Sequence, residues 1–323
     1  MPEKAPWDEI AIPHEDHNVR LVTADTAVPC FWGRDTAGNC LFILELQGDH
    51  ATQYRRDAVV VRGIETDLRS GESGTQHLVL TLQRHIDRDL FEGLCRTMIS
   101  SLVHAGDSAS SLALAIALAH IRRWKAFLSG SGHHLSAGEV RGLFAELSFL
   151  HEMIDRGLPD RAAIESWVGS EQAHQDFIFG NTAVEIKALS GAERNSVRIS
   201  SEDQLESLND ALYLRIYRLS ILDAAPGAHS LNQLVALIMD RLDEAQAIEA
   251  FEQKLVARGY APLPDYDAPF LVVSELRSYR VGDGFPRLVR SRMPQGVMNV
   301  AYDLALEALA PYECPDDAMH GCS

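Results

Sequence analysis

Asp176, Glu185 and Lys187 are charged residues in an otherwise apolar segment, HQDFIFGNTAVEIKAL. Side chains alternate between the two faces of a strand, so Glu185 and Lys187 are predicted to share one face. Burying a charge costs several kcal/mol unless the charge is paired or binds a metal ion. The segment therefore predicts a site where two carboxylates and an ammonium converge, with a cation as the compensating partner.

A hairpin is the element expected to bring these charges together. Its predicted strands, 175–179 and 183–189, flank the turn residues Gly180, Asn181 and Thr182. A helix that contains Glu146 is predicted to precede the hairpin, over residues 136–157. The other predicted elements of this middle region are a strand at 163–168, a helix at 200–210 and a strand at 212–222.

Four regions are predicted along the chain. Residues 1–90 are strand-rich, with a hairpin turning at Asp35 to Asn39 and strands at 58–65 and 77–83. Residues 91–135 form two connecting helices, and residues 136–225 form the core around the charged hairpin. Residues 226–323 form a mixed extension, with a helix over 229–258, a strand at 269–279 and a helix over 297–309. The expected fold class is α/β, of the α+β type.

Composition favours a globular protein. The chain has 323 residues, 46% hydrophobic and 23% charged, enough for one large or two modest cores. Its longest aliphatic run, 111–119, is shorter than the roughly 20 residues that span a bilayer, and its start lacks the apolar segment of a signal peptide. A cytoplasmic location without a membrane partner is therefore expected. The five cysteines contain no CxxC motif and are expected to be reduced.

One segment, residues 277–292, is basic in an acidic chain. The formal charge of −17 argues against indiscriminate binding to nucleic acid. The segment nevertheless has a single acid and five arginines: Arg277, Arg280, Arg287, Arg290 and Arg292. It is either a solvated, arginine-rich strand pair or a surface that follows DNA phosphates, and a nuclease-like site nearby would favour the second interpretation.

The middle region resembles the PD-(D/E)xK nuclease superfamily, whose fold is restriction-endonuclease-like. The resemblance rests on Glu146 in the opening helix, Asp176 on a strand and, after eight intervening residues, Glu185-Ile186-Lys187. More narrowly, GLFAELSFL, SWVGS, QDFIF, VEIKAL and RISSEDQL are similar to bacterial PD-(D/E)xK motif proteins, which tend to be encoded beside restriction or phage-defence genes. Residue 175 is Gln where the motif has Pro, and the match covers about residues 138–210.

The resemblance implies a Mg²⁺-dependent DNA endonuclease, in which Mn²⁺ can substitute. Mg²⁺ prefers one or two protein carboxylates and leaves its other positions to water and phosphate oxygens. Asp176, Glu185 and the backbone carbonyl of Ile186 are the expected ligands. Lys187 is expected to hold and polarise the attacking water or to stabilise the developing negative charge. Glu146 would orient Lys187 or hold a metal-bound water, and its alternative is a merely structural polar break in the helix.

Three residues near the predicted helix at 200–210 are further candidates. Gln204 would contact phosphate or the catalytic lysine, or else complete a capping box with Ser201. Arg198 and Ser200 would bind phosphate at the N-terminus of that helix, where unpaired N–H groups favour anions.

The favoured function is DNA cleavage within a bacterial restriction or anti-phage system. One alternative is a catalytically silent DNA-binding or scaffold subunit, and another is a metal-dependent hydrolase of RNA or a nucleotide. The chain lacks GxSxG, GxxxxGK[ST] and GxGxxG motifs, so serine hydrolase, NTPase and dinucleotide functions have no motif to support them. The expected partners are DNA and a helicase, ATPase or methyltransferase from the same locus, and a homodimer is a further option.

Overall fold

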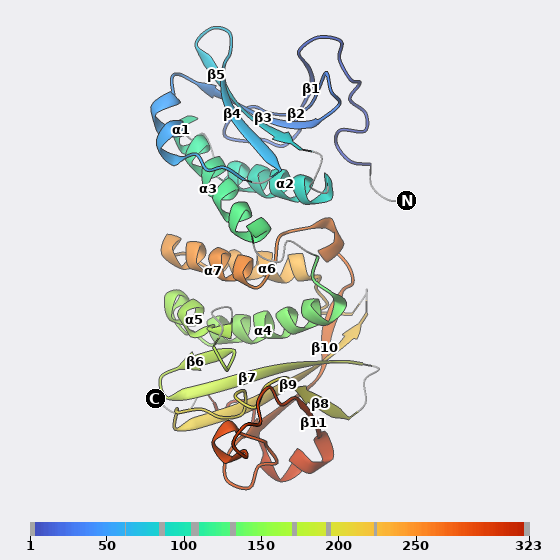
Figure 1. The fold of residues 1–323 in the computed structure, drawn as a ribbon, viewed down its shortest axis with the longest axis vertical. Helices are drawn as coiled ribbons and strands as arrows, with labels where there is room; N and C mark the ends of the chain where they lie inside the picture. The colour runs from blue at the N-terminus through green and yellow to red at the C-terminus, as the bar shows by residue number, and fades with distance from the viewer. Residues whose placement is uncertain are drawn as a thin grey trace. The chain divides into compact units, whose positions relative to one another are not determined.

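The computed structural model describes residues 4–61, 63–83, 88–104, 110–129, 134–169, 173–191, 195–222 and 225–319 (Figure 1). The chain divides into two compact units. The N-terminal unit consists of residues 1–133 and 259–264, and the C-terminal unit consists of residues 134–258 and 265–323. The two helices predicted as connectors belong to the N-terminal unit, and the charged hairpin belongs to the C-terminal unit.

The N-terminal unit contains a five-stranded antiparallel sheet with helices packed against it. Its elements are β1 (His17–Leu21), β2 (Cys30–Asp35), β3 (Cys40–Gln47), α1 (Ala51–Asp57), β4 (Ile64–Ser70), β5 (Thr75–Leu82), α2 (Arg88–His104) and α3 (Ser110–Ser129). The strand order is β1-β2-β3-β5-β4, and α3 packs against α1, α2 and β3.

Most of the predicted N-terminal elements are confirmed. The hairpin turns between β2 and β3, where the side chain of Asp35 accepts hydrogen bonds from the N–H groups of Ala37 and Asn39. The strand predicted at 58–65 is wrong in its position, since β4 begins only at Ile64. Its apolar start is not part of the sheet, and Val60 is 86% exposed.

The C-terminal unit contains the charged hairpin within a second five-stranded sheet. The remaining elements of the chain are α4 (Ala137–Asp155), α5 (Asp160–Ser166), β6 (Phe177–Phe179), β7 (Thr182–Ser190), β8 (Ser196–Ile199), β9 (Ala211–Ile221), α6 (Leu231–Met239), α7 (Ala245–Ala257), η2 (Pro264–Tyr266), β10 (Leu271–Arg280), η3 (Arg290–Arg292), β11 (Tyr302–Ala305), η4 (Leu306–Tyr312) and β12 (Glu313–Cys314). The strand order is β12-β10-β9-β7-β6, in which β7 and β9 are parallel and the other neighbours are antiparallel.

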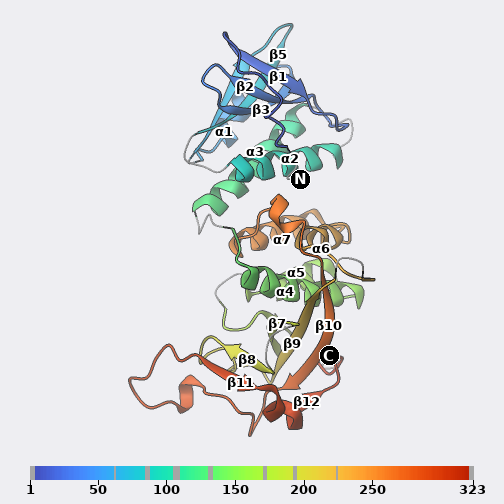
Figure 2. The ribbon, with the colours of Figure 1, turned by 90° about the vertical axis from the view of Figure 1, so that its right-hand side faces the viewer.

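Helices cover one face of this second sheet in two layers. In Figure 2, α4 and α5 lie between the sheet and the pair formed by α6 and α7. The opposite face is covered by the β8–β11 ribbon and η4, with a buried core that includes Leu189, Leu214, Tyr279 and Leu304. The strand β7 is therefore covered on both faces, and a charge on it must find its partner inside the protein.

The helix α4 begins and ends where the sequence predicts. Ser136 caps it by accepting a hydrogen bond from the Glu139 N–H, and the Glu139 side chain returns to the Ser136 backbone, which completes a capping box. Its buried stripe includes Leu143, Leu147 and Leu150. Glu146 lies within this stripe and is itself buried, so the helix directs a carboxylate toward the interior.

Two predicted elements in the middle region are wrong. The segment 163–168 is not a strand, because α5 occupies residues 160–166, and only Trp167 forms an isolated bridge, with Phe177. The acidic residue in the first turn and the Arg161–Glu165 ion pair, four residues apart, both favour this helix. The predicted helix at 200–210 is also wrong, since this segment forms turns.

Two predicted helices of the C-terminal extension are also wrong in part. The helix predicted over 229–258 is two helices, α6 and α7, and between them the Asp243 N–H donates to Asp160 on α5. The helix predicted over 297–309 is the short strand β11 followed by the 3-10 helix η4. Asn299 has a positive φ of 57°, which interrupts a helix, and Tyr302 to Ala305 pair with β8.

The α+β architecture implied by the restriction-endonuclease-like resemblance is confirmed. Cys30, Cys40, Cys95 and Cys314 are free thiols, as expected, while Cys322 lies outside the described residues. Within the described part of the chain, no helix is both long enough and apolar enough to cross a membrane.

Candidate active site

The structure places Glu185 and Lys187 side by side on β7. Lys187 Nζ lies 2.8 Å from Glu185 Oε1, as the shared strand face predicts. The Glu185 side chain is 2% exposed and the Lys187 side chain 14% exposed. The lysine side chain is therefore somewhat more accessible to solvent than the glutamate side chain, and both are largely buried.

Asp176 joins this pair through the backbone. It lies one residue before β6, where its N–H donates to the Val184 carbonyl and its own carbonyl accepts from the N–H groups of Val168 and Gly169. Its carboxylate Oδ2 accepts a 2.8 Å hydrogen bond from the Ile186 N–H, the amide between Glu185 and Lys187. The carboxylate is thus fixed against the strand that carries the other two charges.

Gly169 allows this close approach. A Cβ at position 169 would lie 2.8 Å from Asp176 Oδ1 and 3.1 Å from Asp176 Cα. The first distance is shorter than real Cβ contacts and the second is tighter than most, so a side chain at 169 would force Asp176 to shift, which glycine avoids.

Glu146 also reaches this group of charges, from α4. Its side chain is 5% exposed, and Oε2 accepts a 2.8 Å hydrogen bond from the Trp167 indole N–H. Its other oxygen, Oε1, is paired with the guanidinium of Arg258, at the C-terminal end of α7. Glu146 interacts electrostatically with Asp176, Glu185 and Lys187. With both oxygens engaged, Glu146 is better placed to hold neighbouring groups than to bind a metal ion directly.

Burial raises the pKa values of all three carboxyl groups. Burial first, then repulsion from Asp176, raises the pKa of the Glu185 carboxyl to about 8, although the Lys187 ammonium opposes the rise. Burial and the Asp176 charge likewise raise the pKa of Glu146, against the effect of Arg258. Burial raises the pKa of Asp176, with the Ile186 N–H and the Lys187 charge opposing it.

The donor set fits a hard divalent cation. Three carboxylates face two cations, Lys187 and Arg258, so the site has an excess of negative charge when its acids are ionised. Within the residues that the structure describes, no group of three or more His, Cys, Asp or Glu side chains is placed to hold a metal ion. Two side chains remain that could hold such an ion, Asp176 and Glu185. Two are enough, because Mg²⁺ is usually bound through only one or two protein carboxylates. The predicted Ile186 carbonyl ligand stays a prediction.

Gln204 contacts the lysine from a loop rather than from a helix. Its Oε1 accepts hydrogen bonds from Lys187 Nζ at 3.1 Å and from the Ser200 N–H at 2.8 Å. The helix needed for a capping box is absent from this described segment, and Ser201 Oγ instead accepts from the Asp203 N–H. The helix whose N-terminus was to hold phosphate is likewise absent from this described segment, and phosphate contacts of Arg198 and Ser200 stay a prediction.

The arginines predicted to bind DNA separate into two groups. Three have acidic or carbonyl partners in the C-terminal unit: Arg277 with Glu275, Arg287 with the Leu205 carbonyl, and Arg290 with Asp203. Arg280 and Arg292 are exposed, and exposed Arg198 lies 3.5 Å from Asp303. The segment 277–292 is not a strand pair, since only its first residues belong to β10.

The sequence did not single out four residues that shape the site: Trp167, Gly169, Gln175 and Arg258. Trp167 and Gly169 lie in SWVGS, one of the segments that carries the family resemblance, which is the only sequence signal for them. Gln175 stands out in the sequence only as a departure from the motif. Arg258 lies 112 residues from Glu146 in sequence, and no local pattern indicates that the two side chains meet.

The order of helix, hairpin and parallel strand places this core in the PD-(D/E)xK class, with Glu185 and Lys187 on β7 and Asp176 directly before β6. The chain belongs to the family described as "Putative PD-(D/E)XK family member, (DUF4420)", whose model matches residues 4–307. The match includes most of both compact units. No curated protein and no solved structure matches the chain.

Proposed function

We propose that this protein is a Mg²⁺-dependent endonuclease that hydrolyses phosphodiester bonds in DNA. Members of the PD-(D/E)xK superfamily are generally nucleases, and the chain belongs to a family described as part of it. The observation that carries the proposal is the contact of Lys187 Nζ with Glu185 Oε1 at 2.8 Å, beside an Asp176 carboxylate anchored on the Ile186 amide. A scaffold subunit has no need for two carboxylates and a lysine in this arrangement.

Asp176 and Glu185 are the proposed ligands of Mg²⁺ or Mn²⁺, with the Ile186 carbonyl as a third. A bound divalent cation supplies positive charge to a phosphate oxygen and lowers the pKa of bound water. Burial has already raised the pKa values of both carboxyl groups, so these side chains gain more from a cation than exposed acids do.

Lys187 is the proposed group that acts on the attacking water and on the developing negative charge. Two acceptors, Glu185 Oε1 and Gln204 Oε1, fix the position of its ammonium. Donors that are already oriented stabilise a transition state without reorganising during the reaction. Glu146 is proposed to act indirectly, because its two oxygens bind the Trp167 indole and the Arg258 guanidinium at the edge of the same site.

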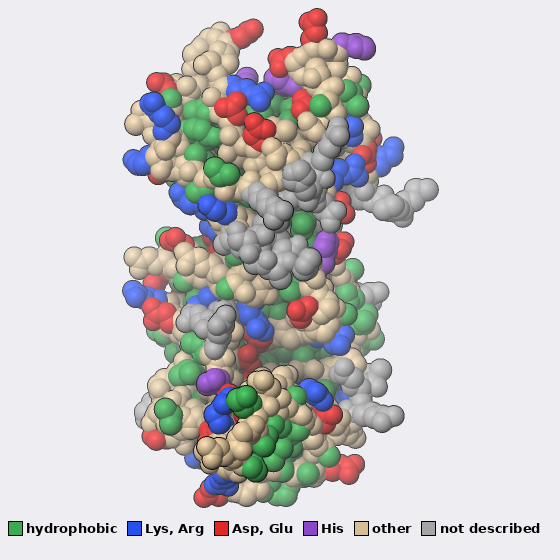
Figure 3. All heavy atoms as spheres, in the orientation of Figure 1, with side chains coloured by type: hydrophobic (Ala, Val, Ile, Leu, Met, Phe, Trp, Pro, Cys, Tyr) green, Lys and Arg blue, Asp and Glu red, His purple; other side chains and the backbone are tan. Residues whose placement is uncertain are grey.

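DNA contacts are proposed for the exposed arginines Arg280, Arg292 and Arg198. In the space-filling view, the Lys and Arg side chains of the described residues on the face shown are interspersed with Asp and Glu and form no continuous basic stripe (Figure 3). Each phosphate contact contributes about 0.9 to the slope of log K against log salt. Replacing Arg280 and Arg292 with Ala should flatten this slope by up to about 1.8, equally for all DNA sequences. An unchanged slope would show that neither arginine contacts DNA phosphate.

A bacterial restriction or anti-phage role is proposed for this activity, with a helicase, ATPase or methyltransferase partner from the same locus. The support is the similarity to proteins encoded beside defence genes. Phage plaque counts on cells expressing the complete locus, with wild type or Glu185→Ala, test this role. Equal counts would separate the nuclease from defence.

Plasmid cleavage tests the enzymatic proposal. Purified protein, with the products of neighbouring genes where needed, is incubated with supercoiled DNA and Mg²⁺ or EDTA. Wild type should nick or linearise the DNA only with the metal, and Glu185→Ala should not. Glu165→Ala is the matched control, because Glu165 is an exposed acid on α5 paired with Arg161. Equal cleavage by wild type and Glu185→Ala would assign the nuclease to another chain and favour the scaffold function.

A further inference from the structure

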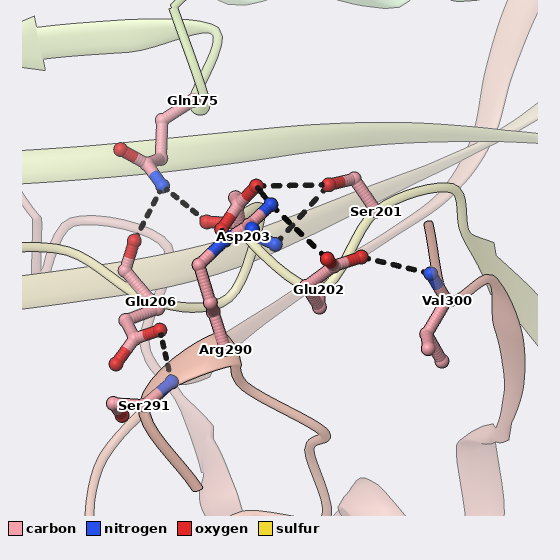
Figure 4. Close-up of polar contacts among 8 residues, drawn as sticks. All are labelled: Gln175, Ser201, Glu202, Asp203, Glu206, Arg290, Ser291 and Val300. Atoms are coloured by element: carbon pink, nitrogen blue, oxygen red, sulfur yellow. Dashed lines mark hydrogen bonds and ion pairs between the residues drawn. The ribbon is translucent and has the colours of Figure 1, made fainter. Parts of the chain in front are cut away.

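The 200–206 loop, which carries Gln204, is held in place by side chains from two other parts of the C-terminal unit (Figure 4). Two backbone hydrogen bonds shape its turns, from the Gln204 N–H to the Ser201 carbonyl at 3.3 Å and from the Glu206 N–H to the Asp203 carbonyl at 3.2 Å. Turns of this kind do not fix a side chain by themselves, so the position of Gln204 depends on these external contacts.

Gln175 holds the loop from the inside. Its side chain is buried, and Nε2 donates toward the backbone carbonyls of Asp203 at 3.1 Å, Gln204 at 3.2 Å and Glu206 at 2.9 Å. The two N–H bonds of this amide are thus shared among three backbone carbonyls, so one buried side chain connects three positions of the loop. A proline, the motif residue at this position, has no side-chain donor.

The segment after β10 holds the same loop from the outside. The guanidinium of Arg290 forms a two-point contact with Asp203, at 2.7 and 2.8 Å, and also lies 3.1 Å from Glu202. Backbone N–H groups add to this grip, since Val300 donates to Glu202 and Ser291 donates to Glu206. Bidentate contacts of arginine with a carboxylate fix direction as well as distance.

These contacts link the surroundings of Asp176 to those of Lys187 in the candidate active site. Gln175 directly precedes Asp176, a proposed metal ligand, and its amide fixes the backbone at Gln204. Gln204 Oε1 in turn accepts from Lys187 Nζ. The path Gln175, Gln204, Lys187 therefore connects the residue next to the Asp176 carboxylate to the position of the Lys187 ammonium.

We infer that Gln175 is a positioning residue for Lys187, which it orients through the backbone and side chain of Gln204. The inference rests on the proposed nuclease function. Arg290 also helps to position Lys187, because it holds the loop that carries Gln204 through Asp203. Arg290 is then a structural clamp of the active site rather than a contact for DNA phosphate.

Substitution of Gln175 by methionine, which keeps the shape and removes the donor, tests the inference. Gln175→Met should lower kcat for DNA cleavage by about 10- to 100-fold, the usual effect of removing a group that supports an active-site residue, and should leave KM within about twofold. The loss should nearly disappear when Gln204 is already Ala, because the path to Lys187 is then broken. Full additivity of the two losses would overturn the inference.

Gln233→Met is the matched control. Gln233 also tethers backbone with its side chain, in the capping box of α6 with Ser230, but it has no contact with the 200–206 loop among the described residues. It should lower the melting temperature without changing kcat at temperatures where the protein stays folded. If Gln233→Met lowered kcat as much as Gln175→Met does, the loss would reflect reduced stability in both variants, and the inference would be overturned.

Arg290→Ala is the second variant, and it keeps the inference testable if Gln175→Met does not fold. Arg290 is 58% exposed, so its loss should leave the fold intact. A clamp predicts a lower kcat with an unchanged salt slope of DNA binding. A DNA contact predicts the opposite, a flatter slope with an unchanged kcat, and that result would overturn the role of Arg290 as a clamp.

Hydrogen exchange provides a measurement that does not require cleavage. The Ser200 N–H donates to Gln204 Oε1, so its exchange reports the position of Gln204. Gln175→Met and Arg290→Ala should each speed exchange in a peptide spanning 197–207, and Gln233→Met should not. If wild type does not cleave DNA, the proposed function fails while faster exchange still supports the anchoring of the loop. Unchanged exchange in both loop variants would overturn the inference.

Discussion

Arg258, the residue directly after α7, forms an ion pair with Glu146 in the middle of α4. The Glu146 side chain is 5% exposed and that of Arg258 is 31% exposed. A helix from the second layer thus contributes a cation to an acidic site in the layer below it. The pair matters because Glu146 also interacts with the charge of Asp176, and Arg258 offsets part of that repulsion.

Arg258→Ala should destabilise the C-terminal unit by leaving a buried carboxylate without its cation. Because Arg258 is partly exposed, we expect a loss of about 1 to 3 kcal/mol in the free energy of unfolding, below the cost for a fully buried pair. Glu146→Gln in the same chain should recover much of the loss, since the amide needs no cation. Urea denaturation of the two single variants and the double variant measures this coupling, and additive losses would contradict it.

The melting temperature should report metal binding. An ion that binds the folded state alone adds RT ln(1 + [L]/Kd) to stability, so Mg²⁺ or Mn²⁺ should raise the melting temperature of wild type. Asp176→Asn should remove most of the shift, because it removes a proposed ligand. Asp303→Asn is the control, since Asp303 is an exposed acid on β11, and it should keep the full shift. If Asp176→Asn keeps the shift as well, Asp176 is not a ligand.

Without metal, stability should fall as the pH rises through the neutral range. Burial raises the pKa of Glu185 from 4.5 to about 8, in a group that also contains Asp176, Glu146, Lys187 and Arg258. At Glu185 the folded state then binds more protons than the unfolded state between these two values, so the contribution of this group to stability is greatest below about 4.5 and decreases toward about 8. Glu185→Gln should flatten this decrease, measured by denaturation in EDTA from pH 5 to 8.

Saturating Mg²⁺ should oppose the same decrease in wild type, because metal binding favours the ionised carboxyl groups. The stabilisation by Mg²⁺ should therefore be larger at pH 8 than at pH 6. A pH profile that is identical in wild type and Glu185→Gln would place the titrating group elsewhere.

Local patterns predicted the hairpin, α4 and the shared face of Glu185 and Lys187, since alternation and capping depend on neighbours in sequence. They could not predict the 200–206 loop. A helix there would direct the carbonyls of residues 203, 204 and 206 to amides four residues later, but Gln175 binds these three carbonyls instead. Gln175 lies 28 to 31 residues from these carbonyls in sequence. Helix propensity depends on residues that are close in sequence, so it cannot predict this competition.

The same reason explains which site residues the sequence revealed. Charged residues on apolar strands are unusual, so Asp176, Glu185 and Lys187 stand out. Arg258 follows an ordinary amphipathic helix and precedes a glycine, which is a common way for a helix to end. Its function becomes visible only when α7 packs over α5 and brings the guanidinium to Glu146.

Gly169→Ala should disturb the site from the backbone side. The new Cβ would lie 2.8 Å from Asp176 Oδ1 and 3.1 Å from its Cα, so the Asp176 carboxylate must move. Metal affinity, measured by calorimetry, should fall by about 10-fold or more. Gly142→Ala is the matched control: no neighbour lies within 4 Å of its Cβ in α4, and it should stabilise the helix by about 1 kcal/mol. Unchanged metal affinity in Gly169→Ala would show that the contact with Asp176 is not required.

Lys187→Ala separates catalysis from assembly. The ammonium is proposed to act once negative charge develops, so its loss should lower DNA cleavage by at least about 100-fold, the range expected for one transition-state stabiliser. Folding and DNA binding should survive, measured by melting temperature and by filter binding. Lys125→Ala, an exposed lysine of the N-terminal unit, should cleave like wild type.

The assay must include any ATPase or helicase encoded nearby, because a subunit that depends on a partner is inactive alone. Two outcomes then distinguish the functions. If Lys187→Ala and Glu185→Ala both abolish cleavage while DNA binding persists, the lysine and the carboxylate act on the phosphodiester itself. If the reconstituted system cuts DNA equally well with either substitution, the nuclease is another component, and the buried Lys187–Glu185 pair holds together a scaffold.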